Sequence, residues 1–445
     1  MSSPAVSDEE SSGLLHHPRE REASPIKLAI YSTSSYLCFY GLRKPWVVLL
    51  YNDVPPIFGA SPKVAIAASQ MIFYFLGKTF GVKIVAGVPQ NKLHRALAIS
   101  GIVAAAAWIG FALFPYGPLT LVAAALGGFP LALTWSLIYR YVEGRRCSDA
   151  VGGVMGCSIV VGPGLAKLVC AAAARWCTSI GIGEWDAPLL TACIFLPLLL
   201  ISLHGLDRTP PPTQSERAEL GDRAVRIGGV SSVGGASSLG PILREHWPGI
   251  LAVGLFNALT LGARELRDVF QPELWVALFG HTPSPHTFLL TELPAALLLL
   301  MLLPFLSTVR QPARALLLMH LLMLGSGLCL PLLSGLRASR SISGEVWFSL
   351  LGGAIFVGTV TVTACFSDRL VSALKLAGSS AALIQLIDAF GYAGSLLTLA
   401  IVEYSDPKPG RLLPTAEGFF IFMGPTSVLC ALASGVYWFH GIARR

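Results

Sequence analysis

The sequence predicts an all-α protein that crosses a membrane many times. Hydrophobic residues make up 53% of the 445 residues, charged residues make up only 13%, and the mean hydropathy is +0.65. A soluble domain carries roughly 25% charged residues, which it needs for its surface. Apolar runs recur along the chain, and about 20 such residues are enough for a helix to cross a bilayer. Lipid is therefore the predicted solvent for most of the chain.

Twelve apolar runs are long enough to be membrane-spanning helices. They are predicted at 26–51, 62–87, 95–115, 118–140, 148–176, 186–206, 247–277, 285–307, 312–334, 344–367, 374–404 and 416–441. A proline run and a Gly/Ser stretch separate the sixth from the seventh, which is a composition typical of linkers. We therefore predict a disordered cytoplasmic tail at 1–25, six-helix bundles at 26–206 and 247–445, and a cytoplasmic linker at 207–246.

The loops between these runs indicate an orientation. Lys and Arg concentrate on one side, for example at Lys92, Arg95 and Arg314. Because basic loops stay in the cytoplasm, both termini are predicted to be cytoplasmic. In the tail, the sequence ESSGLL at 10–15 has the form of an acidic dileucine sorting signal. Such a signal would direct the chain to endosomal, lysosomal or vacuolar membranes; the plasma membrane is the alternative.

The same composition argues against several classes of protein. The net charge of +7 is scattered over short loops, without the basic face that nucleic-acid binding requires. The nine cysteines form no CxxC pair, so we predict no metal site, no disulfide framework and no cofactor. We find no spacing typical of a nucleophile with its base, and so predict no catalytic residues and no enzyme. The expected protein is a monomer whose partners are a small anionic substrate and the bilayer.

Charged residues inside the predicted spans are the main functional signal. A charge at the bilayer centre costs on the order of 3 kcal/mol or more, so it usually faces a cavity or a partner. The basic residues exceed the acidic ones: they are Arg43, Lys44, Lys78, Lys83, Lys167, Arg264 and Arg267, against Glu265, Asp268, Glu292 and Asp388.

Three of these cations are predicted to bind a substrate, with an aromatic neighbour. Lys83 lies near a membrane edge, Arg267 can pair with a neighbouring acid, and Lys44 points about 100° away from Arg43 on a helix. Arg43, Lys78 and Arg264 remain, and Arg favours oxyanions because its planar fork binds two oxygens at once. The sequence Tyr40-Gly-Leu-Arg43 in the first predicted helix has an echo, LGAR at 261–264, in the seventh. Repeated halves place equivalent residues on opposite sides of one midplane site, so the two arginines are expected to clamp an anion.

The buried acids leave two interpretations open. Asp388, Glu292 and Glu265 could form ion pairs, or Asp388 and Glu292 could exchange a proton that couples transport to a gradient. Arg267 and Asp268 could pair with each other or with Glu265.

Several short motifs resemble the major facilitator superfamily, and within it the organophosphate:phosphate antiporters. This resemblance rests on FYGLRKP at 39–45, YFLGK at 74–78, Arg264 and the Gly-rich segment 378–394. The resemblance implies twelve helices in two halves, and it implies that Arg43 and Arg264 bind a phosphate group with Lys78 nearby.

The chain also resembles an uncharacterised facilitator-like family in YVEGRR at 141–146, RELRD at 264–268 and DAFGY at 388–392. It departs from the antiporters in two places. The fifth helix has Ile159 near the position of their histidine, and PQNKLHR at 89–95 lacks their Asp-Arg gating motif.

The leading expectation is a secondary transporter that moves a small organic or phosphorylated anion by alternating access. One alternative is a transport-dead sensor or scaffold with the same fold. The other is a proton symporter of a neutral solute, in which the cations only neutralise Glu265, Asp268 and Asp388.

Overall fold

A computed structural model describes residues 23–115, 117–142, 145, 147–213, 216, 239–309, 311–374 and 380–443. The predicted sorting signal, nearly all of the predicted tail and most of the predicted linker lie outside these residues. The described chain is helical almost throughout, which confirms the predicted all-α fold class.

The helices of the first half precede the linker. They are α1 (Pro25–Arg43), α2 (Pro62–Gly87), α3 (Leu93–Leu113), α4 (Pro118–Val142), α5 (Ser148–Ser179) and α6 (Ala187–Asp207), with short 3-10 turns η1 (Pro45–Val48), η2 (Gln90–Lys92) and η3 (Glu184–Asp186). Several begin with proline, whose fixed φ and missing N–H suit the first turn of a helix. Within this half α1 packs against α4, α5 and α6, and α2 packs against α4.

The helices of the second half follow the linker, and several of them are interrupted. They are α8 (Leu239–Val269), α9 (Gln271–Phe279), α10 (Pro285–Leu290), α11 (Leu293–Thr308), α12 (Pro312–Ala338), α13 (Gly344–Val360), the π-helix η5 (Thr361–Phe366), α14 (Ser367–Leu374), α15 (Ser380–Tyr404) and α16 (Pro409–Ala443). The predicted seventh, eighth and tenth spans are thus each divided, since local breaks do not change the mean hydropathy of a run.

Eleven of the described helical segments are long and apolar enough to cross a membrane. The first predicted span, which contains α1, is the one of the twelve that does not meet this criterion. Four consecutive hydroxyl-bearing residues, Ser32 to Ser35, lower its hydropathy. Because α1 lies against α4, α5 and α6, protein rather than lipid surrounds much of it.

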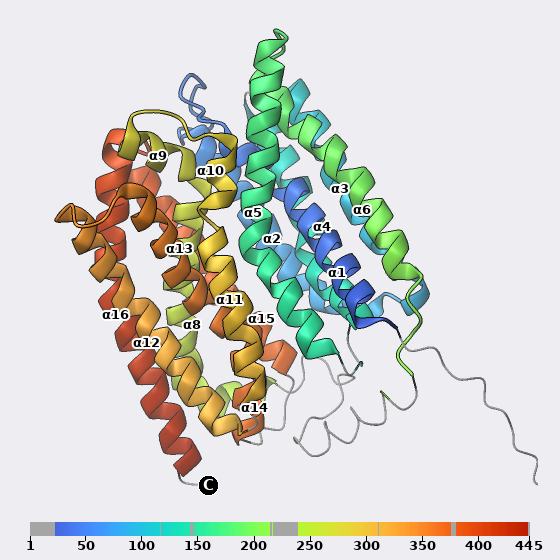
Figure 1. Cartoon of the computed structure of the whole chain (residues 1–445), viewed down its shortest axis with the longest axis vertical. Helices are drawn as coiled ribbons and strands as arrows, with labels where there is room; N and C mark the ends of the chain where they lie inside the picture. The colour runs from blue at the N-terminus through green and yellow to red at the C-terminus, as the bar shows by residue number, and fades with distance from the viewer. Residues whose placement is uncertain are drawn as a thin grey trace, which may run out of the picture.

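The two sets of helices lie side by side, with blue to green on one side of Figure 1 and yellow to red on the other. They meet where α5 contacts α10 and α11, and where α2 contacts α15. Both α1 and α8 begin, and α6 and α16 finish, at the end drawn at the bottom of Figure 1. We call the opposite end, where α1, α5 and α8 finish, the far end.

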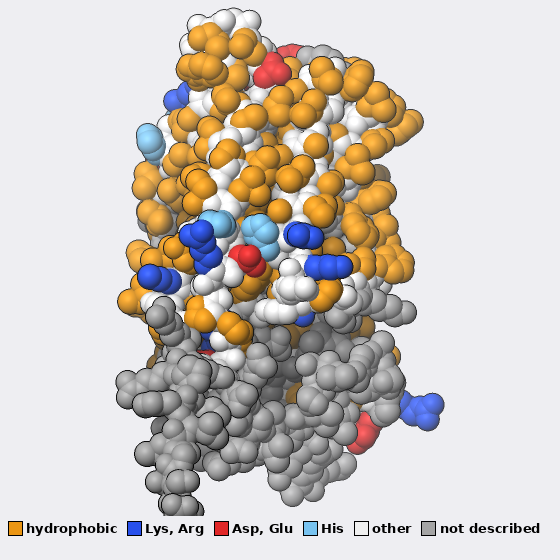
Figure 2. All heavy atoms as spheres, turned by 90° about the vertical axis from the view of Figure 1, so that its right-hand side faces the viewer, with side chains coloured by type: hydrophobic (Ala, Val, Ile, Leu, Met, Phe, Trp, Pro, Cys, Tyr) orange, Lys and Arg blue, Asp and Glu red, His pale blue; other side chains and the backbone are white. Residues whose placement is uncertain are grey.

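The surface fits a membrane. Figure 2 shows one face covered with apolar side chains over most of its height, with Lys, Arg and His gathered in a band toward the end at which α1 begins. Apolar side chains turned outward are stable when lipid covers them.

Close helix contacts depend on glycine at defined positions. A Cβ at Gly394 of α15 would lie 2.1 Å from the carbonyl oxygen of Ala258 in α8. A Cβ at Gly77 of α2 would lie 2.6 Å from the carbonyl oxygen of Phe129 in α4. Small residues let backbones approach closely in membranes, where no hydrophobic force drives helices together.

Candidate functional site

The first candidate arginine lies at the end of an interrupted helix. Helix α1 finishes at Arg43, and Pro45 starts η1. The indole of Trp108 donates to the carbonyl oxygen of Leu42 (2.8 Å), and the side-chain amide of Gln70 donates to that of Arg43 (3.1 Å). The last carbonyls of a helix lack intrahelical partners, so these donors let α1 finish inside the protein.

Arg43 and three other side chains form one face of a central site between the halves. The guanidinium of Arg43 lies 3.9 Å from the centre of the Tyr74 ring, and the Lys78 ammonium lies 5.9 Å from it. The Tyr74 ring lies 5.2 Å from the ring of Tyr392 in α15. Cation–π contacts of this kind hold a cation without neutralising its charge.

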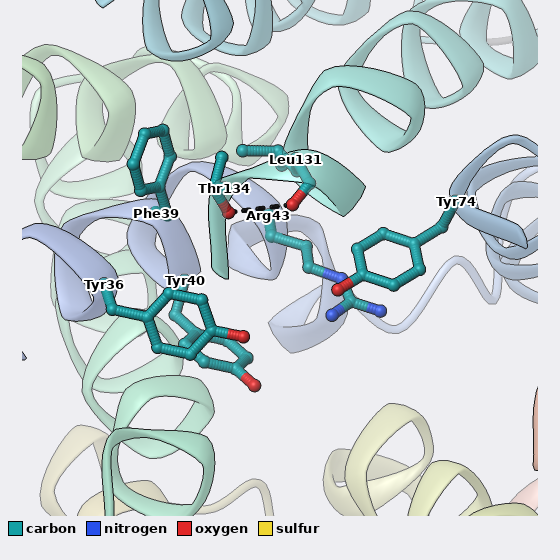
Figure 3. Close-up of a pocket in the computed structure, with 7 residues that line it drawn as sticks. All are labelled: Tyr36, Phe39, Tyr40, Arg43, Tyr74, Leu131 and Thr134. Carbon is teal, nitrogen blue, oxygen red and sulfur yellow. Dashed lines mark hydrogen bonds between the residues drawn. The ribbon is translucent and has the colours of Figure 1, made fainter. Parts of the chain in front are cut away.

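A small cavity opens beside this guanidinium (Figure 3). Its volume is about 10 Å³, enough for about one water molecule. Tyr36 and Tyr40 lie across the cavity from Tyr74, and their hydroxyls point toward the side where the Arg43 guanidinium lies. The lining consists of Tyr36, Phe39, Tyr40, Arg43, Tyr74, Leu131 and Thr134.

The second half contributes Arg264 and Asp388. The guanidinium of Arg264 lies 5.9 Å from the centre of the Phe356 ring and within electrostatic range of Arg43. Lys78 and Arg264 lie within electrostatic range of the Asp388 carboxylate. Among the described residues the site thus gathers three cations and one carboxylate, an excess of two positive charges.

A second cluster of charges begins with the residues that directly follow the two arginines, Lys44 after Arg43 and Glu265 after Arg264. Lys44 donates to Glu265 (2.7 Å) and lies 2.9 Å from Asp268. Lys167 of α5 lies 2.7 Å from the other oxygen of Asp268 and also contacts Gln271. These charges neutralise one another, and they join α1 and α5 of the first half to α8 of the second.

Two further ion pairs are buried. Lys63, at the start of α2, lies 2.6 Å from Glu273 of α9 and donates to the carbonyl oxygen of Leu49 (3.0 Å). Arg267 binds Glu292 with one nitrogen near both oxygens (2.8 and 2.9 Å). The first pair joins the two halves, and the second lies within the second half.

A hydrogen bond between the halves lies near the Lys63–Glu273 pair. Glu403, in the last turn of α15, accepts from the backbone N–H (2.9 Å) and the hydroxyl of Ser61. Together with Lys63, this residue ties the beginning of α2 to two helices of the second half.

A larger hollow, of about 270 Å³, lies at the far end between the halves. Its lining includes Asp53, Arg175, Glu184 and Trp185 of the first half, and Pro272 and Phe288 of the second.

Comparison with known proteins identifies the family of this chain. A family model described as a family of unknown function (DUF5690) matches residues 45–440. The chain belongs to this family. The search of curated proteins finds no match for the sequence.

Solved structures show which fold this family member has. A bacterial homologue of the human drug peptide transporters is 11% identical, with a TM-score of 0.64 over 94% of this chain and 98% of that one. A peptide transporter in complex with alafosfalin is 16% identical, with a TM-score of 0.62 over 94% and 95%. A proton-dependent oligopeptide transporter is 12% identical, with a TM-score of 0.62 over 95% and 99%. The chain therefore has the major facilitator type of fold that these transporters share.

The predicted substrate residues lie together and lack carboxylate partners at ion-pair distance. Within the described residues, Arg43, Lys78 and Arg264 form no ion pair, and the Nε atoms of both arginines are buried without a hydrogen-bond partner. Tyr40 lines the same cavity as Arg43. Asp388 lies toward Lys78 and Arg264.

The other predicted acids serve the surrounding ion pairs. Glu265 binds Lys44 and Glu292 binds Arg267. The two suggested partners of Arg267, Asp268 and Glu265, are wrong, because the Arg267 side chain reaches Glu292 while both of those carboxylates receive lysines. The Lys83 side chain lies outside the described atoms.

Sequence reasoning missed several residues of this region. Tyr74 precedes Lys78 by four positions and Tyr392 follows Asp388 by four, so each tyrosine shares a helix face with a charge already identified. Lys63, at the edge of a predicted span, was not among the selected charges, but it is 3% exposed, as is Glu273. Neither carried a local signal, because each is buried only through contact with the other half.

Proposed function

We propose that this protein is a secondary active transporter of a small organic or phosphorylated anion that works by alternating access. The observation that carries the proposal is a contrast between two groups of cations inside the helix bundle. Lys44, Lys63, Lys167 and Arg267 each bind a carboxylate at 2.6–2.8 Å. Arg43, Lys78 and Arg264 do not, within the described chain. A cation that is kept unneutralised inside a membrane protein is costly, and it marks a binding site for an anion.

The charge of the central site favours a divalent anion. Three cations and Asp388 leave an excess of two positive charges, which a phosphate monoester would neutralise. The forks of Arg43 and Arg264 suit the oxygens of phosphate or carboxylate. The tyrosines and Phe39 offer rings and hydroxyls to the organic part of the ligand. The resemblance to organophosphate antiporters in Arg43, Lys78 and Arg264 supports the same ligand.

The contacts between the halves support alternating access by two six-helix bundles. Glu265, Asp268 and Glu273 of the second half bind lysines of the first half on the far side of the arginines. With both termini in the cytoplasm, as proposed from the basic loops, these contacts close the path on the non-cytoplasmic side. Opening requires them to separate.

The structure argues against the neutral-solute alternative. That alternative needs Glu265, Asp268 and Asp388 to neutralise the cations of the site. Glu265 and Asp268 instead bind Lys44 and Lys167. Asp388 alone remains for three cations, so we assign it either a counter-ion role or the coupling proton.

Uptake into proteoliposomes tests the proposal. Arg43→Ala, Arg264→Ala and Lys78→Ala should each reduce uptake of an anionic substrate, which a thermal-shift screen of phosphorylated metabolites, organic acids and dipeptides would first identify. Arg314→Ala is the matched control, because Arg314 is exposed on α12. Uptake that survives the combined Arg43→Ala and Arg264→Ala change at the control level would refute the anion clamp.

A further inference from the structure

Two buried ammonium groups converge on one carboxylate. Lys44 and Lys167 approach the two oxygens of Asp268 at 2.9 and 2.7 Å. The lysine side chains are 1% and 0% exposed. Gln271 contacts Lys167 and donates its amide to Thr291 (3.0 Å), so the surroundings of the lysines are polar and ordered.

The partners of this cluster come from different halves. Lys44 lies at the end of α1 and Lys167 in α5, both in the first half, whereas Asp268 and Glu265 belong to α8. When the halves separate at the far end, both carboxylates leave with α8. Lys44 and Lys167 then remain together on the first half without a negative charge between them.

The cluster lies between the hollow and the central site. Phe288 lines the hollow, and the Lys167 ammonium lies 5.9 Å from the centre of its ring. On the other side, Lys44 directly follows Arg43, whose guanidinium faces the central cavity. A ligand that enters from the far end therefore meets the two lysines before it meets Arg43.

We propose that Lys44 and Lys167 form a second anion-binding site, which Asp268 occupies while the far end is closed and which a phosphate-like anion occupies when that end opens. This inference rests on the alternating access of the proposed function. The site captures the anion at the first-half wall and transfers it to Arg43, one residue farther along α1. The returning Asp268 carboxylate then displaces the anion and closes the far end.

The physical reason is the cost of two adjacent unneutralised ammonium groups. Like charges at short distance repel strongly where the local dielectric is low, and any anion of suitable size that binds both is favoured. The chain's own carboxylate and a ligand anion therefore compete for the same place. Removal of the Asp268 charge leaves the two ammonium groups with Glu265 as the one carboxylate in contact among the described residues, so a phosphate-like anion can take the place of Asp268 even with the halves together.

Thermal unfolding of purified Asp268→Asn protein tests this, with inorganic phosphate as the probe and potassium chloride at equal ionic strength as the reference. Phosphate at about 100 times its Kd should raise the Tm by roughly 3 °C. Each measurement is repeated with Arg43→Ala also present, so that phosphate bound at the central site does not contribute. Failure of the central anion clamp would appear in uptake, whereas failure of this second site would appear in the Tm.

Two variants serve as controls. Glu292→Gln also removes one buried carboxylate, but it leaves a single cation, Arg267, and should show no comparable phosphate effect. Lys167→Met combined with Asp268→Asn removes one of the two ammonium groups and should abolish it. Equal phosphate shifts in Asp268→Asn and Glu292→Gln, or a shift that survives Lys167→Met, would overturn the proposal. One further result would overturn it. The Asp268→Asn protein could fail to be recovered even when it is extracted in phosphate, while the variant that combines Lys167→Met with Asp268→Asn is recovered.

Discussion

The Lys63–Glu273 ion pair joins the two halves at the far end, and under the proposed alternating access its loss should open that end. We consider Glu273→Gln, which keeps the shape of the side chain and removes its charge. Lys63 would retain the Leu49 carbonyl oxygen at 3.0 Å, but it would lose the carboxylate at 2.6 Å. Since α2 carries Lys63 and α9 carries Glu273, the lost interaction belongs only to the arrangement in which the two halves meet.

The magnitude follows from burial. Both residues are 3% exposed, and removal of one partner of a buried ion pair costs about 3–5 kcal/mol. Every 1.4 kcal/mol changes an equilibrium about tenfold. The ratio of open to closed molecules should therefore rise by roughly 10²- to 10³-fold, and the remaining hydrogen bonds favour the lower figure.

Cysteine labelling measures this ratio. Leu49 lines the hollow at the far end and is 2% exposed, so Leu49→Cys should react slowly in the closed arrangement and faster when the end opens. The exposed Cys193 and Cys329 are replaced by serine. Glu273→Gln should then speed labelling by about 10²-fold, up to the limit set by the fully open state.

The matched control is Glu292→Gln. Its partner Arg267 lies 2.8 Å away, and both side chains are 2% exposed, but the two residues belong to the same half. Its loss should lower the Tm without faster labelling of Leu49→Cys. Labelling that Glu273→Gln speeds no more than Glu292→Gln does would refute the role of the Lys63 pair in holding the halves together.

Three further predictions concern the site, the packing and a loop thiol. Tyr74→Leu should weaken anion binding about tenfold in calorimetric titration, because a desolvated cation–π contact is worth up to about 2 kcal/mol. Tyr74→Phe keeps the ring and should change the affinity by less than about threefold. Gly394→Ala should destabilise the fold by about 1–3 kcal/mol, since the new Cβ meets the Ala258 carbonyl; Gly410→Ala, with open space around it, should not lower the Tm. Burial raises the pKa of the Cys147 thiol, which lies between two spans, so less thiolate forms at pH 8. Alkylation of Cys147 should therefore be slower than in unfolded protein, and its rate should keep rising above pH 9. An unchanged pH–rate profile after unfolding would contradict this.

Composition and hydropathy were enough to predict the fold class and most of the spans. The predicted runs miss the breaks between α8 and α9 and between α10 and α11. Each of these breaks precedes a helix with proline in its first turn, Pro272 in α9 and Pro294 in α11. At the end of α1, Gln70 and Trp108 supply donors to the carbonyl oxygens of Arg43 and Leu42. A hydropathy average over about 20 residues does not register such donors.

The candidate cations could be selected from the sequence, but their ion-pair partners could not. Arg43, Lys78 and Arg264 could be selected because a charge in an apolar run is locally visible. A continuous helix would also separate Lys44 from Arg43 by about 100° around the axis, although α1 in fact finishes at Arg43. The identity of the Lys44 partner was not visible, because Glu265 lies 221 positions away along the chain.

The sequence by itself determined that this is a multi-spanning helical protein with more positive than negative charge inside its spans. It could do so because hydropathy and charge are properties of single residues that add along a run. Only the tertiary structure decided which cations are neutralised: Lys44, Lys63, Lys167 and Arg267 have carboxylates in contact, whereas Arg43, Lys78 and Arg264 have none among the residues that the structure describes. An ion pair depends on a distance of a few ångströms between helices that are remote in sequence, and only the packing of the halves sets that distance.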